Sequence, residues 1–339
     1  MLQQECALLD LLVCPKSKSP LSRVGDALQS AEGLRYPLLD GVPILRDTSG
    51  GEVRHEGPLE VWSGYEPTIA FMLDSLPPNE VILDLGSGNR ALDNPRIIRS
   101  DICLTAHVDV VADAHALPFK DNSIGMVYAT AVFEHLHSPW VAAQEIWRVL
   151  KPGGYALVDC NFVFPFHGFP AVYFNASAEG LRRLFCQFTE LQVMAAPWQM
   201  PSFTIETVLG EYLRFFKAES AEELRFAEAL KNLRHHPLRS FDARFAQADA
   251  QRIAAAVTYF GTKQPEGSET LLPAPLLHLW QRDTALQARY ERPADLLPSN
   301  EAPMSNLLHW AATDGRAVHP DIDVWYRACK PFSKGRFVP

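Results

Sequence analysis

The chain contains a short segment whose residues could bind a nucleoside. Residues 81–85 form an apolar run that includes Asp84, and Gly86, Ser87 and Gly88 follow it directly. An apolar run without alternation is typical of a parallel strand that is covered on both faces, and glycines let the backbone approach a ligand closely. We therefore expect a ligand to bind at the carboxyl end of this strand.

Acidic residues at the ends of three successive apolar segments indicate which nucleoside is bound. The glycines loosely fit a dinucleotide fingerprint, but Asp84 would repel a pyrophosphate. Its charge instead suits an ammonium and a sulfonium group, and S-adenosylmethionine (SAM) carries both. Asp101 ends the next segment, where a carboxylate can accept hydrogen bonds from both ribose hydroxyls. Asp113 ends the third and could receive the adenine amino group, with the backbone of Ala114 facing the ring.

These segments resemble a known family. Between about residues 79 and 161, the chain is similar to class I SAM-dependent methyltransferases of the type 11-like group, which act on small molecules and glycans. The matching segments are 84–88, 110–119, 127–136 and 145–154. The resemblance implies a Rossmann-like α/β fold with a doubly wound, mostly parallel seven-stranded sheet, and SAM as the cofactor. It implies cofactor contacts at Asp84, Gly86, Ser87, Gly88, Asp101, Asp113, Ala114 and Glu134.

Two positions depart from the pattern of this family. Arg90 stands where the loop usually has its third glycine, and Gly125 stands where an acid usually precedes the fourth strand. The turn around the methionine part of the cofactor must therefore differ, or a side chain must support it. Neither departure removes an expected contact with ribose or adenine.

The remaining sequence divides into further units. Residues 1–47 resemble a small α+β Trm112-like domain, but Ser17 replaces the second thiolate after Cys14, so we expect no zinc or other metal. The methyltransferase domain is predicted at 55–264 and includes a helix at 60–76 before the first strand. A helical insertion at 203–252 would cap the active site before a final antiparallel strand. A C-terminal extension at 265–339, with a helix at 273–290, could form a contact between copies of the chain in a homo-oligomer or a clamp over the fold.

Composition limits the partners that we expect. The 339 residues are 47% hydrophobic and carry a formal net charge of −9, which disfavours nucleic acid because phosphate binding relies on Lys and Arg. No apolar run approaches the roughly 20 residues of a membrane-spanning helix, and the first ten residues do not resemble a signal peptide. We therefore expect a cytoplasmic protein with no membrane partner, whose six cysteines are reduced.

Histidines near the carboxyl ends of the fourth and fifth strands are the candidates for a general base. Methyl transfer from a sulfonium depends mainly on positioning, but a hydroxyl acceptor also needs a base. His167, in the loop after strand five, is the preferred base, and His135 is either a second candidate or a structural residue. Phe166, Tyr173 and Asn175 could contact the acceptor, although the last two could instead hold the loop in place and the aromatic residues of this region could form a small core.

The preferred interpretation is a SAM-dependent methyltransferase that acts on a small-molecule acceptor, such as a sugar or glycan precursor or a secondary metabolite. RNA methylation is an alternative because of the Trm112-like domain. A SAM-binding partner protein without catalysis is another, in view of Arg90 and Gly125. An NAD-dependent oxidoreductase is disfavoured by Asp84.

Overall fold

The computed structural model describes residues 8–47, 53, 76–90, 94–167, 171–196, 199–234, 239–242 and 244–264. The helix expected at 60–76, apart from Leu76, lies outside these residues. So does the whole C-terminal extension at 265–339, with its expected helix at 273–290.

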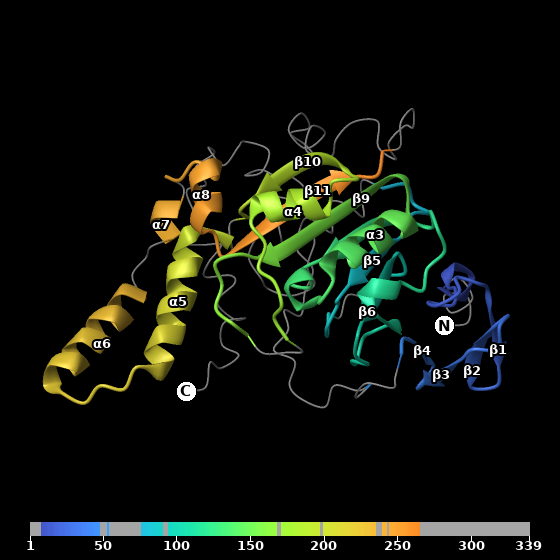
Figure 1. Cartoon of the computed structure of the whole chain (residues 1–339), viewed down its shortest axis with the longest axis horizontal. Helices are drawn as coiled ribbons and strands as arrows, with labels where there is room; N and C mark the ends of the chain where they lie inside the picture. The colour runs from blue at the N-terminus through green and yellow to red at the C-terminus, as the bar shows by residue number, and fades with distance from the viewer. Residues whose placement is uncertain are drawn as a thin grey trace.

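One mixed sheet runs through the described part of the chain (Figure 1). Its strand order is β1-β2-β3-β4-β7-β6-β5-β8-β9-β11-β10. The strands are β1 Leu21–Val24, β2 Ala27–Ser30, β3 Arg35–Leu39, β4 Val42–Leu45, β5 Ile82–Leu85, β6 Ile97–Asp101, β7 Val110–Ala112, β8 Ile124–Ala129, β9 Leu150–Asn161, β10 Thr189–Met194 and β11 Ala256–Thr262. From β7 to β10 in this order are seven strands, in which β7, β6, β5, β8 and β9 are parallel and β11 is antiparallel to both neighbours. The expected α/β fold is confirmed.

Buried apolar residues account for the central strands. All four residues of β5 and all six of β8 are buried, as expected for parallel strands that are covered on both faces. Helices and short 3-10 turns complete the described fold: η1 Ala114–Ala116, η2 Phe133–His135, α3 Pro139–Val149, α4 Ala178–Leu184, α5 Pro201–Phe215, α6 Ala221–Arg234, α7 Arg239–Asp242 and α8 Gln247–Ile253. Among the described residues, no helix combines the length and apolar character that crossing a bilayer would require.

The helices that follow β10 lie at one end of the molecule. Between β10 and β11, the described chain forms α5, α6, α7 and α8, and α5 and α6 lie opposite the N-terminal module in Figure 1. The expected insertion at 203–252 falls on these helices. The chain that leaves β9 comes close to the start of α5, where the rings of Phe164 and Phe203 have centroids 6.1 Å apart.

The N-terminal module joins the sheet, whereas we had expected a separate small domain. Ile44 and Leu45 of β4 pair in parallel with Val111 and Ala112 of β7. Without this pairing, β7 would be an open edge strand with unpaired backbone groups. This pairing joins the described part of the module, residues 8–47, to the sheet. The prediction that they lack a metal is not tested by this arrangement.

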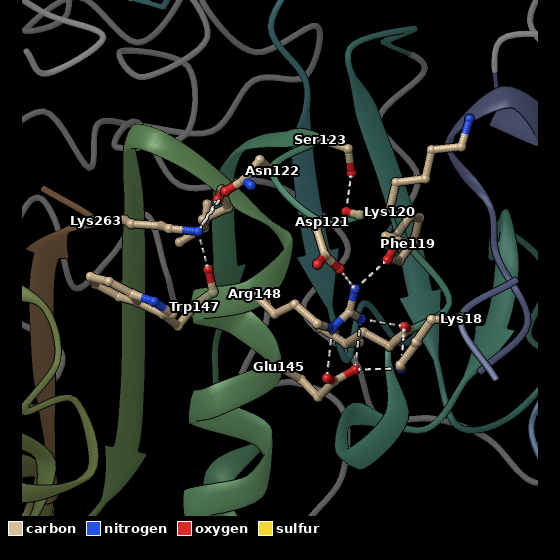
Figure 2. Close-up of polar contacts among 12 residues, drawn as sticks. Lys18, Phe119, Lys120, Asp121, Asn122, Ser123, Glu145, Trp147, Arg148 and Lys263 are labelled. Atoms are coloured by element: carbon tan, nitrogen blue, oxygen red, sulfur yellow. Dashed lines mark hydrogen bonds and ion pairs between the residues drawn. The ribbon is translucent and has the colours of Figure 1, made fainter. Parts of the chain in front are cut away.

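A polar network also connects the module to residues 117–148 of the central part of the chain (Figure 2). The Lys18 ammonium donates to Glu145 at 2.8 Å and to the Leu117 carbonyl at 3.2 Å. Arg148 donates to the same Leu117 carbonyl at 2.8 Å and forms ion pairs with Glu145 and Asp121, each at 2.7 Å. The network therefore holds the segment after Asp113, where the adenine contact is expected, against both α3 and the module.

Replacing Arg148 with alanine should lower the free energy of unfolding by about 2 kcal/mol, because several charge-assisted hydrogen bonds in a half-buried site are lost together. Chemical denaturation of the full chain measures this. Arg182→Ala is the matched control, since Arg182 also pairs with two acids, Glu179 and Glu190, but on the exposed surface. Its loss should be within about 1 kcal/mol. Equal losses in the two variants would contradict the role assigned to Arg148.

Candidate functional site

The glycine loop after β5 has a backbone conformation that other residues rarely adopt. Gly86 and Gly88 have φ angles of +71° and +56°. A Cβ atom on Gly86 would collide with Cγ2 of Val132, in the segment that follows β8. The N–H groups of Gly86 and Ser87 donate to the carbonyl of Ser100 at 2.7 and 3.0 Å. The loop is thus folded back across the end of the neighbouring strand.

Asp84 has a protein partner that we did not expect. Its carboxylate is fully buried and forms an ion pair of 2.9 Å with Arg90, which also donates to the Gly86 carbonyl at 3.0 Å. We had expected Asp84 to face the positive charges of the cofactor. Because a buried carboxylate requires a counter-charge, the arginine in place of the third glycine supplies one and braces the loop from within. Arg90 also lies over the Tyr128 ring, 5.4 Å from its centroid.

Asp101 and Asp113 lie at the expected strand ends, and both already order the nearby backbone. Asp101 accepts hydrogen bonds from the N–H groups of Gly88 at 3.0 Å and Cys103 at 2.9 Å. Asp113 caps η1 through the His115 N–H at 2.9 Å and contacts His115 Nδ1 at 2.6 Å. Hydrogen bonds and the charge of His115 lower the pKa of Asp113 despite its partial burial. Ala114, the next residue in the chain, is buried.

The family usually has an acid where this chain has Gly125, and the carboxylate of Glu80 lies beside that position. A Cβ atom on Gly125 would lie 2.9 Å from an oxygen of Glu80, which therefore occupies the adjacent space. Glu80 pairs with Lys151 at 2.6 Å. This departure from the family pattern lies at the amino end of β8, away from the expected cofactor contacts at the strands' carboxyl ends.

Buried hydroxyl groups at the carboxyl edge of the sheet suit a polar ligand. Ser87 follows β5, Ser100 lies near the end of β6, and Thr130 follows β8; none of their hydroxyls has a hydrogen-bond partner among the described residues. Orphaned hydroxyls are uncommon in protein interiors. Together with the glycine loop and the carboxylates of Asp101 and Asp113, they fit a ligand with ribose hydroxyls and an adenine, as SAM has.

Glu134 is the centre of a second cluster, which follows β8. Its carboxylate is fully buried and accepts a hydrogen bond of 2.6 Å from Asn161, while His167 Nε2 lies 3.8 Å from the same oxygen. Burial raises the pKa of Glu134 to about 8. The backbone carbonyl of Glu134 accepts from the N–H of Tyr173 at 2.7 Å. Glu134 therefore connects the end of β8 to the acceptor loop, in addition to its predicted role beside the cofactor.

The two candidate bases, His135 and His167, meet in this cluster. Their rings are 5.1 Å apart, edge to face. Each Nδ1 contacts a backbone carbonyl, at 2.7 Å for His135 with Ala171 and 3.2 Å for His167 with Pro165. When Nδ1 carries the proton, Nε2 has a free electron pair, which is the form that a base requires. Burial lowers the pKa of His135, consistent with a neutral ring.

Glu134, His135 and His167 also bring one potential ligand atom each to within 4.8 Å of one another. Asn161 already donates to Glu134 and approaches His167 Nε2 at 3.4 Å. The Asn161 amide thus links Glu134 to His167, and we interpret the cluster as a hydrogen-bonded network. The sequence prediction of no metal remains a prediction.

The predicted acceptor residues differ in their surroundings. Phe166 and Tyr173 are exposed, so both are accessible from solvent. Asn175 instead donates to the carbonyls of Phe162 at 2.9 Å and Phe164 at 3.3 Å, which holds the loop in place. This supports the structural interpretation of Asn175 that the sequence left open.

Sequence reasoning missed a buried carboxylate near the end of β9. Asp159 accepts from the Ala131 N–H at 2.7 Å and from Gln199 at 3.3 Å. Burial raises its pKa to about 7, although the Ala131 N–H and the charge of Arg90 act in the opposite direction. Ala131 has a positive φ of 53°, so Asp159 stabilises a strained backbone beside the site. An acid within the apolar run 155–160 was the available signal.

Glu134 should make the stability of the protein depend on pH. Its folded pKa of about 8 lies above the ordinary carboxyl value, so the stability that it contributes is present in acid and is lost as the pH rises toward 8. Glu134→Gln keeps an oxygen for Asn161 but cannot ionise. At about pH 9 the variant should be more stable than the wild type by about 4–5 kcal/mol, because each pKa unit of this difference corresponds to about 1.4 kcal/mol, and near pH 5 the two should agree within about 1 kcal/mol. A difference in the free energy of unfolding between the two proteins that does not change from about pH 5 to about pH 9 would contradict the effect.

Comparisons with known proteins agree with this geometry. Residues 79–158 match a family model described as a methyltransferase domain. The chain is 62% identical over 40 residues to a UPF0434 protein of Vesicomyosocius okutanii subsp. Calyptogena okutanii, covering 12% of this chain and 68% of that protein. It is 33% identical over 146 residues to an uncharacterized methyltransferase of Mycobacteroides abscessus, covering 43% of this chain and 49% of that one.

A further relative is a tRNA (carboxymethyluridine(34)-5-O)-methyltransferase of Arabidopsis thaliana, with 34% identity over 110 residues, 27% of this chain and 26% of the relative. The chain thus spans less than half of the length of each of these two methyltransferases.

Proposed function

The chain is a SAM-dependent methyltransferase of class I with an N-terminal Trm112-like module of the UPF0434 family, and we propose that its acceptor is a small molecule. The observation that supports this most is the cluster of Glu134, Asn161 and His167, which lies at the carboxyl edge of the sheet beside the proposed cofactor site. His167 is 36% exposed while Glu134 is fully buried, so the imidazole can meet an acceptor that arrives from solvent while the carboxylate stays inside.

The residues of the site have distinct roles in this proposal. When bound, SAM supplies a methyl group that is attached to a positively charged sulfur. After transfer of the methyl group, this sulfur is part of a neutral thioether. Asp101 orients the ribose, while Asp113 and Ala114 hold the adenine. The loop with Gly86, Ser87 and Gly88 gives the methionine part its backbone contacts. Asp84 acts through Arg90 by holding the shape of that loop.

His167 Nε2 accepts the proton of a hydroxyl acceptor, and His135 packs against its ring. Phe166 and Tyr173 line the acceptor's approach. Positioning of this kind can contribute roughly 7–11 kcal/mol to lowering a barrier, and a base about 3–5 kcal/mol. A cytoplasmic location, a homo-oligomer and the absence of membrane partners belong to the same proposal.

RNA is the second candidate acceptor, because one relative is a tRNA methyltransferase. The net charge of −9 disfavours it, since RNA backbones are bound mainly by Lys and Arg.

Incubation of the purified chain with methyl-labelled SAM separates the two acceptors. One reaction contains deproteinised RNA, and the other contains a small-molecule extract from the same cells. Label is expected in the small-molecule fraction alone. Label in RNA without label in small molecules would contradict the proposal. Asp101→Ala included in both reactions shows that transfer uses the described site.

Asp101→Ala should weaken SAM binding by about 1–3 kcal/mol, because the charge-assisted hydrogen bonds to ribose are lost. Isothermal calorimetry measures this directly. Asp109→Ala is a suitable control: Asp109 is a nearby carboxylate that pairs with Arg99 at 2.9 Å and has no predicted ribose contact. Unchanged SAM affinity in Asp101→Ala would mean that another residue holds the ribose.

A further inference from the structure

An open apolar groove of about 710 Å³ lies between the chain that leaves β9 and helix α5. Its lining includes Phe162, Phe164, Pro165, Val208, Tyr212 and Phe215. Of the described residues that line it, Glu211 alone carries a charge. The volume lies within the roughly 300–1,000 Å³ that is usual for small-molecule sites, which are mostly apolar with few polar groups.

The groove adjoins the proposed catalytic cluster through Phe164, which lines the groove and contacts His167. The Phe164 ring lies edge to face against His167, with centroids 5.2 Å apart, and faces Phe203 of α5 at 6.1 Å. Backbone hydrogen bonds from Phe162 to Ala255 and from Val163 to Ala254, of 2.8 and 3.1 Å, fix this wall of the groove. A molecule that packs against Phe164 in the groove would therefore lie one ring away from His167.

The opposite wall presents apolar side chains that are only partly covered among the described residues. Val208 is 44% exposed, Tyr212 49% and Phe215 70%. Apolar surface that gathers in one hollow usually marks a binding site, because each part of it gains free energy when water is removed. A sugar would leave its hydroxyls without partners on such walls, which is costly.

We propose that this groove binds the hydrocarbon portion of the methyl acceptor and presents its hydroxyl group to His167. The inference rests on the proposed small-molecule function and replaces the sugar-like acceptor with one that carries an apolar tail. In the reaction, the acceptor oxygen forms a bond to the methyl carbon while the carbon–sulfur bond breaks and its electron pair stays on sulfur. The hydroxyl proton passes to Nε2 of His167.

A series of 4-alkylphenols tests the groove, since the phenol hydroxyl is constant and the tail grows. Binding of 4-butyl-, 4-hexyl- and 4-octylphenol is measured by calorimetry on the full chain saturated with S-adenosylhomocysteine. Affinity should rise by about fourfold for each added methylene until the groove is filled. Val208→Asp should weaken 4-octylphenol about tenfold or more and leave S-adenosylhomocysteine binding unchanged, because a carboxylate in the groove must be desolvated.

Leu224→Asp is the matched control. Leu224 is 57% exposed on the neighbouring helix α6 and does not line the groove, so this variant should bind every phenol as the wild type does. Equal weakening in the two variants would overturn the proposal, because binding would then be non-specific. Affinity that is independent of tail length would also overturn it. That result is expected if another occupant, such as residues 265–339 of this chain, fills the groove.

The two proposals fail in different ways. Transfer of label from SAM to phenols irrespective of tail length would support the small-molecule function and show that the groove does not bind the acceptor. Label that enters only RNA would remove the small-molecule function itself.

Discussion

Replacing Arg90 with methionine is expected to lower the free energy of unfolding by about 3–5 kcal/mol, the cost of removing one partner of a buried ion pair. The Asp84 carboxylate is fully buried, and Arg90 at 2.9 Å supplies its counter-charge. Methionine preserves much of the apolar stem but not the charge. The loss should therefore come from the unbalanced carboxylate rather than from a cavity.

The pH dependence of this loss identifies its cause. In the variant, the buried Asp84 should bind a proton more readily when folded than when unfolded, so stability is present in acid and is lost as the pH rises. The deficit relative to the wild type should consequently be smaller near about pH 5 than near about pH 8. Urea denaturation at several pH values measures it.

The double variant Arg90→Met/Asp84→Leu provides the control for Arg90→Met. A buried ion pair can often be exchanged for apolar residues at little cost, so the double variant should recover most of the lost stability. A double variant as unstable as the single one would contradict the account, because the loss would then come from packing of the arginine stem.

Replacing His167 with alanine is expected to reduce turnover of a hydroxyl acceptor by about 10²- to 10⁴-fold, the usual contribution of a general base. The Nε2 atom lies 3.8 Å from the Glu134 carboxylate, with Asn161 beside both. No contact of His167 with the glycine loop or with Asp101 is present among the described interactions, so affinity for SAM should stay within about twofold of the wild type.

Three readouts separate a base from a structural residue at His167. His167→Gln should be as slow as the alanine variant, because glutamine can form hydrogen bonds but cannot take the proton. Turnover of both variants should recover partly at high pH, where the acceptor hydroxyl ionises by itself. A parallel loss of turnover and SAM affinity would assign His167 a structural role.

The strand ends were predictable because the information is local. An apolar run that ends in an acid can be recognised from residues that are adjacent in the sequence. Asp101 and Asp113 lie at the strand ends where this pattern placed them. The ion pair between Asp84 and Arg90 spans six residues, and the absence of a glycine at position 90 was its signal. What the pattern did not reveal is that the arginine turns inward.

The features that sequence reasoning missed depend on contacts between distant segments. The pairing of Ile44 with Val111 attaches the N-terminal module to the sheet across 67 positions, and no local pattern specifies it. Asp159 was hidden within an apolar strand, and its partner Gln199 comes from beyond β10. The groove forms only where the chain after β9 meets α5, so its apolar residues looked like an ordinary small core in sequence.

Calorimetric titration of the purified chain with S-adenosylhomocysteine tests most directly whether the carboxyl edge of this sheet binds the adenosyl cofactor. Saturable heat with one site per chain is expected, together with a rise in the melting temperature, because a ligand that binds only the folded state stabilises it. NADH in the same cell should give neither. Binding of NADH, or no heat and no thermal shift with either SAM or S-adenosylhomocysteine, would contradict the assignment of this edge as a cofactor site.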